Sequence, residues 1–266
     1  MSDFHKHIAH LFKLEEAESH FPLDTPFTGV FLPQHQLIIH CIPLHHTETL
    51  PHNFCVDLSN KAEQLNLKII HLWEDVYIKN KTLVEARLLS LIGVRSRIHA
   101  RKTTIMRIDK QQAEDFLNTH HLQQYVSAYY KYALVLNDEI VAVATFSKSR
   151  VMQDGAVPYR SYELIRFASK TGTTVTGGLG KLLNHFIEQH HPAHLMTYAD
   201  RDWSTGEGYV KLGFTETSRT PPQLFWVDIE TYERSAITPP LLIHKKYVEV
   251  MNAGNIKFVM DRRTTF

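Results

Sequence analysis

A glycine-rich turn between a strand and a helix is the strongest constraint that this sequence places on its fold. Residues 175–183 read Val-Thr-Gly-Gly-Leu-Gly-Lys-Leu-Leu, and apolar residues continue at helical spacing to Ile187. Glycines at the start of a helix leave several backbone N–H groups pointing at one place, and the helix dipole attracts negative charge there. The segment predicts a helix over 178–190 that binds a phosphate or pyrophosphate. The alternative is a glycine turn needed only for close packing.

Two other phosphate-binding patterns do not occur in the sequence. There is no GxxxxGK[ST] motif of the nucleoside-triphosphatase type. The GxGxxG spacing of dinucleotide-binding units does not occur either. The function of the glycine turn must therefore be inferred from the residues around it.

Composition places the chain among folded proteins of about two domains. Its 266 residues are 43% hydrophobic and 21% charged, which is enough apolar material for a buried core, and the net charge is +1. The N-terminus lacks a secretion-signal pattern, and the apolar stretches fall short of the roughly 20 residues that span a bilayer. With only two cysteines, Cys41 and Cys55, we expect a cytoplasmic protein with no membrane partner.

Hydrophobic periodicity and turn residues divide the chain into two α/β regions. Helices are expected at 4–18, 58–66, 79–92, 111–120, 178–190 and 205–212, and strands at 27–32, 36–42, 67–72, 98–108, 133–136, 139–147, 162–168, 195–198 and 224–227. Asn252-Ala253-Gly254-Asn255 predicts the turn of a hairpin over 247–259, with the glycine at positive φ. We expect an α/β (α+β) protein with domains over 1–96 and 97–235, and a C-terminal hairpin tail over 236–266 that packs on the second domain.

The glycine turn is followed in the sequence by a second strand and a second helix that carry polar and aromatic residues. A strand ending at Tyr198-Ala199-Asp200 is followed by Arg201-Asp202-Trp203-Ser204, and then by a helix with Tyr209-x-Lys-x-Gly-Phe. This order of elements resembles the GNAT acyltransferase fold. The resemblance implies that the turn holds the pyrophosphate of acetyl-CoA or another acyl-CoA between two splayed parallel strands, and that Tyr209 protonates the departing thiolate. The implied cofactor contacts are Thr176, Gly177, Gly178, Gly180 and Lys181, while Val175 stands where the GNAT pattern prefers Arg or Gln.

Further blocks narrow the resemblance. They are Ile98-His99-Ala100-Arg101-Lys102, residues 116–123, 162–167, 198–204, 220–222 and 254–255. Together they resemble the Mom-like DNA-modification proteins of phages and mobile elements, GNAT-fold enzymes that place an acyl-derived group on a DNA base. The likeness runs from about Ile98 to the C-terminus, and it has a glycine where this chain has Gln124. It implies DNA as a partner, contacted by Arg101, Lys102, Arg166, Tyr198 and Trp203, and leaves a homodimer open.

An exocyclic base amine is a weak nucleophile, because its lone pair is delocalised into the ring, so it needs positioning and a proton acceptor. Asp200 is the candidate base; the alternative is a structural ion pair with Arg166 or Arg201. Arg201 is the candidate that neutralises developing charge or contacts phosphate. Tyr198 and Trp203 would stack on an extruded base, unless they are buried core aromatics.

The first hundred residues resemble a different module. Residues 27–33, 37–40 and 68–75 are similar to the PD-(D/E)xK restriction-endonuclease fold that precedes this domain in some phage proteins. That fold holds Mg²⁺ with acidic residues, and at those positions this chain has Gly29 and His40. We interpret the region as a degenerate nuclease kept for DNA contact, dimerisation or support. The histidines near Cys41 match no standard zinc spacing, so no metal site is expected.

The leading hypothesis is therefore an acyl-CoA-dependent transferase that modifies a DNA base, at an exocyclic amine or on a hypermodified base. A second hypothesis is a non-catalytic DNA-binding or accessory protein, which Val175 and the missing nuclease acids favour. A third is a GNAT N-acetyltransferase acting on a small amine or a protein. Turnover of acetyl-CoA without any requirement for DNA would favour the third.

Overall fold

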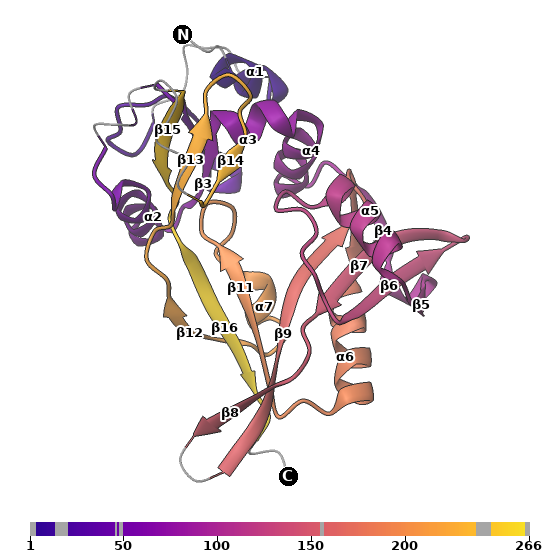
Figure 1. Cartoon of the computed structure of the whole chain (residues 1–266). Coiled ribbons are helices and arrows are strands. Elements are labelled where there is room, and N and C mark those ends of the chain that lie inside the picture. The colour runs from indigo at the N-terminus through magenta and orange to yellow at the C-terminus, as the bar shows by residue number, and fades with distance from the viewer. Residues whose placement is uncertain are drawn as a thin grey trace. The chain divides into compact units, whose positions relative to one another are not determined.

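The chain packs as two compact units, each assembled from three segments. A computed structural model describes residues 4–13, 21–45, 47, 50–154, 157–237 and 246–263 (Figure 1). The first unit contains residues 1–81, 199–207 and 218–256, and the second contains 82–198, 208–217 and 257–266. The expected α/β class is confirmed by the mixture of helices and sheets. The units differ from the expected domain ranges, because two later segments pack with the N-terminal one.

The first unit is built around a small sheet of order β1-β2-β3. Its strands are β1 (Gly29–Leu32), β2 (Leu37–Ile42) and β3 (Lys68–Trp73), with β1 antiparallel and β3 parallel to β2. Every residue of β2 is buried, as expected of a strand covered on both faces. Helix α2 (Phe54–Gln64) connects β2 to β3 and packs Leu58 and Ala62 against Ile38.

A second sheet completes the core of this unit. It has the order β14 (Arg234–Ser235), β13 (Leu224–Asp228) and β15 (Tyr247–Met251). Val227 and Val250 from this sheet pack against Ile42 and Trp73 from the first sheet. The remaining elements of the unit are α1 (Phe4–Leu11), the 3-10 turn η1 (Pro33–His35) and α3 (Glu74–Lys79). The first 81 residues therefore share one apolar core with residues 218–256.

The second unit contains most of a larger sheet of order β12-β16-β11-β9-β7-β6-β5, with β8 paired to β9. The bounds are β5 (Thr104–Arg107), β6 (Tyr130–Leu136), β7 (Glu139–Phe146), β8 (Arg150–Asp154), β9 (Val157–Ser169), β11 (His194–Asp200), β12 (Thr215–Arg219) and β16 (Asn255–Asp261). Its other elements are α4 (Lys81–Leu91), β4 (Ser96–His99), η3 (Ala100–Lys102), α5 (Lys110–His120), β10 (Thr173–Thr176), α6 (Gly178–His190) and α7 (Glu207–Val210). Helix α6 packs on the sheet through Phe186, whose ring stacks on Phe146 at 3.9 Å.

Local sequence signals predicted most of these elements. Helix α6 spans the predicted 178–190, and α5 begins at Lys110, after the N-cap Asp109, whose side chain and that of Gln112 form a capping box. The predicted strand over 98–108 is interrupted by η3, and the predicted helix over 79–92 begins at Lys81 after a break from α3. Helix α1 ends at Leu11, and residues 14–18 of the expected 4–18 helix lie outside the described residues.

The expected C-terminal hairpin is wrong. Strand β15 pairs with β13, whereas β16 lies between β12 and β11 in the larger sheet. The turn between them is correctly predicted in its backbone, since Gly254 has φ 75°. A Cβ on Gly254 would lie 2.4 Å from the carbonyl oxygen of Thr220, so only glycine fits. In the described part of the chain, no helix is long and apolar enough to cross a membrane.

Candidate active site

Two parallel strands of the second unit separate after a short paired stretch. The ladder between β9 and β11 joins His194–Met196 to Ser161–Glu163, and β9 then continues in pairing with β7. One residue beyond the ladder, Thr197 donates its hydroxyl hydrogen to the carbonyl oxygen of Leu164 at 2.9 Å. A side chain thus takes over the contact where the backbones diverge. The opening between β9 and β11 begins at Thr197.

Tyr209 places its hydroxyl at this opening. Its ring lies between Phe214 and Phe258, with centroids 5.8 Å and 5.6 Å away. The hydroxyl hydrogen-bonds to Thr197, and burial raises the pKa of Tyr209 above its usual value, while the Thr197 contact, Arg87 and Arg166 act in the opposite direction. Tyr209 is therefore protonated at neutral pH and can act as a proton donor.

The glycine turn combines an exposed rim with a packed base. Thr176 and Gly177 are exposed, and Gly177 has φ 76° at the start of α6. A Cβ on Gly178 would lie 3.0 Å from Cβ of Val175 and 3.2 Å from Cδ1 of Leu134, so this glycine is required for close packing. A Cβ on Gly180 would lie 3.1 Å from Cδ2 of Leu212. Close packing thus accounts for Gly178 and Gly180, whereas Thr176 and Gly177 leave an exposed rim at the start of α6.

Lys181 has a different position from the expected one. Its ammonium group donates to the carbonyl oxygen of Ala100 at 2.9 Å and to that of Thr103. Ala100 begins the η3 turn and Thr103 directly follows it, and the turn residues Arg101 and Lys102 are exposed. Lys181 thus holds the turn that presents two cations to solvent, and its expected contact with a cofactor is replaced by this structural one.

A pocket of about 270 Å³ lies next to the residues that lead into the glycine turn. Residues from α4, from 120–122 and from 167–174 line it, including Arg87, His121 and Phe167. The Nδ1 atom of His121 accepts the backbone N–H of Gln123 at 3.1 Å. Burial, together with Arg166 and Arg87, lowers the pKa of His121 to about 3, so the ring is neutral at physiological pH. Sequence patterns did not single out Arg87 or His121, because their roles depend on packing between distant segments.

Arg166 stabilises the loop that carries His121. Its Nε–H donates to the carbonyl oxygen of Gln124 at 3.1 Å, and Nη1 donates to that of Ile165 at 3.0 Å. Gln124 has φ 53°, which explains why the related pattern has glycine there. Arg166 is half-buried in these contacts, whereas Tyr198, also expected to contact DNA, has 39% of its surface exposed.

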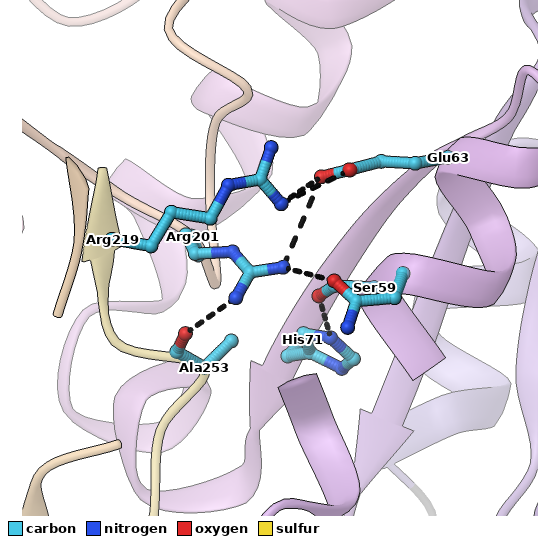
Figure 2. A network of polar contacts seen from close by, with 7 residues as sticks. Ser59, Glu63, His71, Arg201, Arg219 and Ala253 are labelled. Carbon is cyan, nitrogen blue, oxygen red and sulfur yellow. Dashed lines mark hydrogen bonds and ion pairs between the residues drawn. The ribbon is translucent and has the colours of Figure 1, made fainter. Parts of the chain in front are cut away.

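The first unit holds the other expected catalytic residues, and their surroundings are structural. The carboxylate of Asp200 accepts the backbone N–H of Asp202 at 3.0 Å. Arg201 is buried and donates to Oδ1 of Asn60 at 2.9 Å and to the carbonyl oxygen of Ala253 at 3.3 Å (Figure 2). Trp203 is also buried, with 7% exposed. Roles for Arg201 on phosphate and for Trp203 on an extruded base do not fit this burial.

Glu63 connects Arg201 to a surface arginine. Its Oε1 lies 3.8 Å from Nη2 of Arg201, and its Oε2 lies 3.1 Å from Nη1 of Arg219, as Figure 2 shows. The three side chains come from α2, from the 199–207 segment and from β12. The expected charge on Arg201 therefore serves to join segments of the first unit.

Asp202 is a buried acid that sequence reasoning missed. Its Oδ2 accepts the indole N–H of Trp73 at 3.1 Å, and its Oδ1 accepts the backbone N–H of Ala253 at 2.7 Å. Burial, and secondarily the neighbouring Asp200, raises the pKa of Asp202 to about 8. Burial therefore favours the protonated form of Asp202.

The positions that carry magnesium-binding acids in the nuclease resemblance are closed here. Gly29 on β1 faces His40 on β2, and a Cβ on Gly29 would lie 2.2 Å from the ring of Phe21. His40 is fully buried, and burial lowers its pKa to about 3. Its Nδ1 lies 3.1 Å from Nδ1 of His71, whose Nε2 lies 2.9 Å from the Ser59 hydroxyl. Among the described residues, no group of three or more metal-ligating side chains converges.

Comparisons with known proteins give partial likenesses. No protein-family model matches the chain, and no curated protein matches it. Among solved structures, a GNAT family acetyltransferase from Elizabethkingia anophelis with acetyl-CoA bound is similar, with 17% identity, 60% of this chain and 98% of that chain covered, and a TM-score of 0.38. A Bacillus subtilis acetyltransferase in complex with CoA is 14% identical, with 60% of this chain and 99% of that chain covered and a TM-score of 0.39. The ribosomal-protein-S18-alanine N-acetyltransferase from Escherichia coli is 16% identical, with 59% of this chain and 92% of that chain covered and a TM-score of 0.37.

Proposed function

We propose that this chain is an acyl-CoA-dependent transferase of the GNAT type whose acceptor is a DNA base, at an exocyclic amine or on a hypermodified base. The observation that carries the proposal is the separation of β9 and β11 at Thr197, with the protonated hydroxyl of Tyr209 at the opening. The exposed glycine turn at the start of α6 belongs to the same unit. An opening between strands, a proton donor and an anion-binding turn are the parts that acyl transfer from a diphosphate-bearing thioester requires.

The glycine turn fits a diphosphate. Gly177 is exposed, and a Cβ at this position would lie 3.8 Å from the nearest side-chain atom, so phosphate oxygens can approach the backbone closely. The first N–H groups of α6 have no partner within the helix and point out from its N-terminus. Thr176 and residues 177–180 would hold the diphosphate, and the adjacent pocket that Arg87 and Phe167 line would take the arm that carries the acyl group.

The proposed chemistry uses two proton transfers. A bound acyl-CoA would supply an activated carbonyl and a thiolate as the leaving group. Tyr209 donates its hydroxyl proton to the sulfur as the carbon–sulfur bond breaks, and its raised pKa keeps that proton in place beforehand. Asp200 is the candidate, proposed from the sequence, for the acceptor of the proton that the amine loses as the new carbon–nitrogen bond forms.

Exposed cations support DNA as the acceptor. Arg101 and Lys102 extend into solvent from η3, which Lys181 anchors through two carbonyl groups. Cations on an anchored turn can neutralise phosphates, and the exposed ring of Tyr198 offers a face for an extruded base. Arg166, Arg201 and Trp203 are left out of the proposed DNA contact, because other parts of the chain occupy or cover their side chains.

Cofactor binding can be tested with a pair of variants at one exposed position. Thr176→Asp places a negative charge beside the proposed diphosphate, and the same charge near a helix N-terminus favours the helix. Thr176→Asn has nearly the same shape and no charge. We expect the aspartate variant to lose the thermal stabilisation that CoA gives, while its own melting temperature stays equal or rises; the asparagine variant keeps the stabilisation. Equal CoA stabilisation of both variants would exclude the glycine turn as the diphosphate site.

The acceptor is tested by mass spectrometry of nucleosides from duplex DNA incubated with the protein and acetyl-CoA. A mass-shifted nucleoside that disappears with Tyr209→Phe supports the proposal. Acyl transfer to spermidine or to a peptide, with unmodified DNA, would instead indicate an acetyltransferase for a small amine or a protein. If the folded wild type does not bind CoA, both acyltransferase hypotheses are excluded and the non-catalytic DNA-binding hypothesis remains.

A further inference from the structure

The hairpin formed by β8 and the start of β9 extends beyond the rest of its sheet. We call residues 150–154 and 157–161 the ribbon; Arg150 pairs with Ser161, and the register continues to Asp154 and Val157. In Figure 1 the ribbon projects past β6 and β7, and among the described strands β8 pairs with β9 alone. Away from Ser161, which also pairs with His194 of β11, the ribbon is two strands wide, and residues 150–153, 157, 158 and 160 are exposed.

The ribbon exposes apolar side chains to a degree that indicates a partner. Val151 is 69% exposed, Val157 is 72% exposed and Met152 is 44% exposed. A two-stranded hairpin gains little stability from its own contacts, and adjacent exposed apolar residues at its end add none. Their cost in water is offset when another molecule covers them.

The charges on the ribbon identify the kind of partner. Lys148 precedes the ribbon, and Arg150 and Arg160 lie on it; all three are exposed. Asp154, at the turn, is the one acidic residue in the sequence from 148 to 161. Arg150 lies opposite Ser161, whereas Arg160 lies opposite Val151, so the two arginines project from opposite faces. The ribbon thus presents a cation on each side.

The base of the ribbon is held in place by contacts within the second unit. Ser161 Oγ lies 2.8 Å from Nδ1 of His194, and the guanidinium of Arg263 lies 4.4 Å from the centre of the Tyr159 ring. Arg160 Nη1 donates to the hydroxyl of Ser149 at 3.0 Å, which fixes its direction. A ribbon fixed at its base can present its arginines in one geometry, so less freedom is lost on binding.

We propose that the ribbon inserts into the major groove of duplex DNA. That groove is about 12 Å wide and accepts a two-stranded β-ribbon, and phosphates of the two DNA strands line its two sides. Arg150 and Arg160, on opposite faces, would each meet one row of phosphates, and covering the ribbon in the groove would remove Val151 and Met152 from water. This inference rests on the proposed function in taking DNA as the partner, and it adds the element that grips the duplex.

The test compares two double variants of the full chain. Arg150→Gln/Arg160→Gln removes both ribbon cations, and Lys61→Gln/Lys68→Gln removes two exposed cations of the first unit. Binding to a fluorescein-labelled 20-base-pair duplex is measured by anisotropy at several KCl concentrations. We expect the ribbon variant to bind about tenfold more weakly, and the slope of log K against log salt to become shallower by about 1.8, which corresponds to two phosphate contacts. The control variant should show no comparable loss of affinity for the duplex and no comparable change in the salt slope.

Three results would overturn the inference. Equal binding by the ribbon variant and its control shows that DNA binds elsewhere, and the proposed transferase function then stands. No binding of duplex by the wild type removes the ribbon proposal and the DNA acceptor together, while CoA stabilisation still reports on the transferase site. The third result is that Val151→Lys lowers the sedimentation coefficient and leaves DNA binding unchanged, which would make the ribbon a contact between copies of the chain.

Discussion

Arg201 and Asn60 are 141 residues apart in the chain, and a hydrogen bond of 2.9 Å joins Nη2 of the arginine to Oδ1 of the amide. The same guanidinium donates to the carbonyl oxygen of Ala253 at 3.3 Å. A single buried side chain therefore connects all three segments of the first unit. Its position explains why a charged residue next to the proposed base has no exposed surface for a ligand.

Arg201→Ala should lower the free energy of unfolding by about 3 kcal/mol, because it leaves a cavity and removes the donor from the buried carbonyl oxygen of Ala253 and from the half-buried amide of Asn60. Arg219→Ala should cost about 0.5 kcal/mol, since its contact with Glu63 is partly exposed. Urea denaturation of both variants measures the difference. Equal effects would show that the buried network does not depend on Arg201.

Stability should fall in acid because His40 and His71 are buried in neutral form. Burial lowers the pKa of His40 from 6.5 to about 3 and lowers that of His71 as well, with a further contribution from His40. The unfolded chain therefore takes up these protons first, so the stabilisation is complete above about pH 6.5 and is lost as pH falls toward 3. Each histidine adds about 1.4 kcal/mol per pH unit to the slope in this range.

The measurement is the urea midpoint between pH 4 and 7. His40→Gln keeps a polar side chain that does not titrate. The free energy of unfolding should therefore depend less steeply on pH, by the contribution of one histidine. His52→Gln, at an exposed position, is the matched control and should keep the wild-type slope. An unchanged slope in His40→Gln contradicts the prediction.

Gly254→Ala should destabilise the fold by about 3 kcal/mol or more. The added Cβ would lie 2.4 Å from the carbonyl oxygen of Thr220, at a backbone φ of 75°. Gly93→Ala is the control, because Gly93 has φ 89° but no atom within 4 Å of the added Cβ. That variant should cost about 1 kcal/mol, from the backbone conformation alone. Similar melting temperatures for the two would refute the steric argument.

Gln124→Gly should stabilise the chain by up to about 1 kcal/mol. Gln124 has φ 53°, a conformation that glycine adopts without strain, and the contact from Arg166 is to its backbone and is retained. Gln123→Gly, one residue earlier, should lower stability, because glycine adds freedom to the unfolded chain and removes a side chain from the folded one. Differential scanning calorimetry separates the two, and a lower melting temperature for Gln124→Gly would count against this explanation.

Tyr209→Phe should slow acyl transfer about a hundredfold, which is within the usual contribution of a general acid. The ring contacts with Phe214 and Phe258 remain, so CoA affinity should stay the same. Because burial raises the pKa of Tyr209 above 10, wild-type activity should not decline on the alkaline side before that pH. Single-turnover rates measure both effects, with Tyr247→Phe, an exposed tyrosine, as control. A normal rate for Tyr209→Phe excludes the proton donor.

Local patterns were sufficient to predict the elements whose signals lie within one segment. The helix over 178–190 follows from glycines and apolar spacing, and the positive φ of Gly254 follows from its turn residues. The same turn led to a wrong hairpin, because a turn signal does not say which strands its flanks pair with. The strands that β15 and β16 pair with belong to two different sheets. Those sheets are built from residues far away in the sequence.

The candidate site could be predicted only in part for a similar reason. Tyr209 and the glycine turn carry sequence patterns, so both were identified. The roles of Arg201, Trp203 and Lys181 depend on burial and on carbonyl groups of other segments, which no local pattern reports. His121 and Asp202 lie in sequence blocks that carry the resemblance, but their shifted pKa values come from packing, which the blocks do not report.

The order of segments in the first unit has a consequence during synthesis. Ile42 and Trp73 share a core with Val227 and Val250, so the apolar surface around them stays open until the ribosome has reached residue 256. At translation rates of about 5–20 residues per second, this interval after residue 81 lasts on the order of 10–35 s. A nascent chain with exposed β-strands for that long is a natural client of chaperones that bind at the ribosomal exit. The yield of folded protein should then depend on the rate at which the middle part of the mRNA is translated.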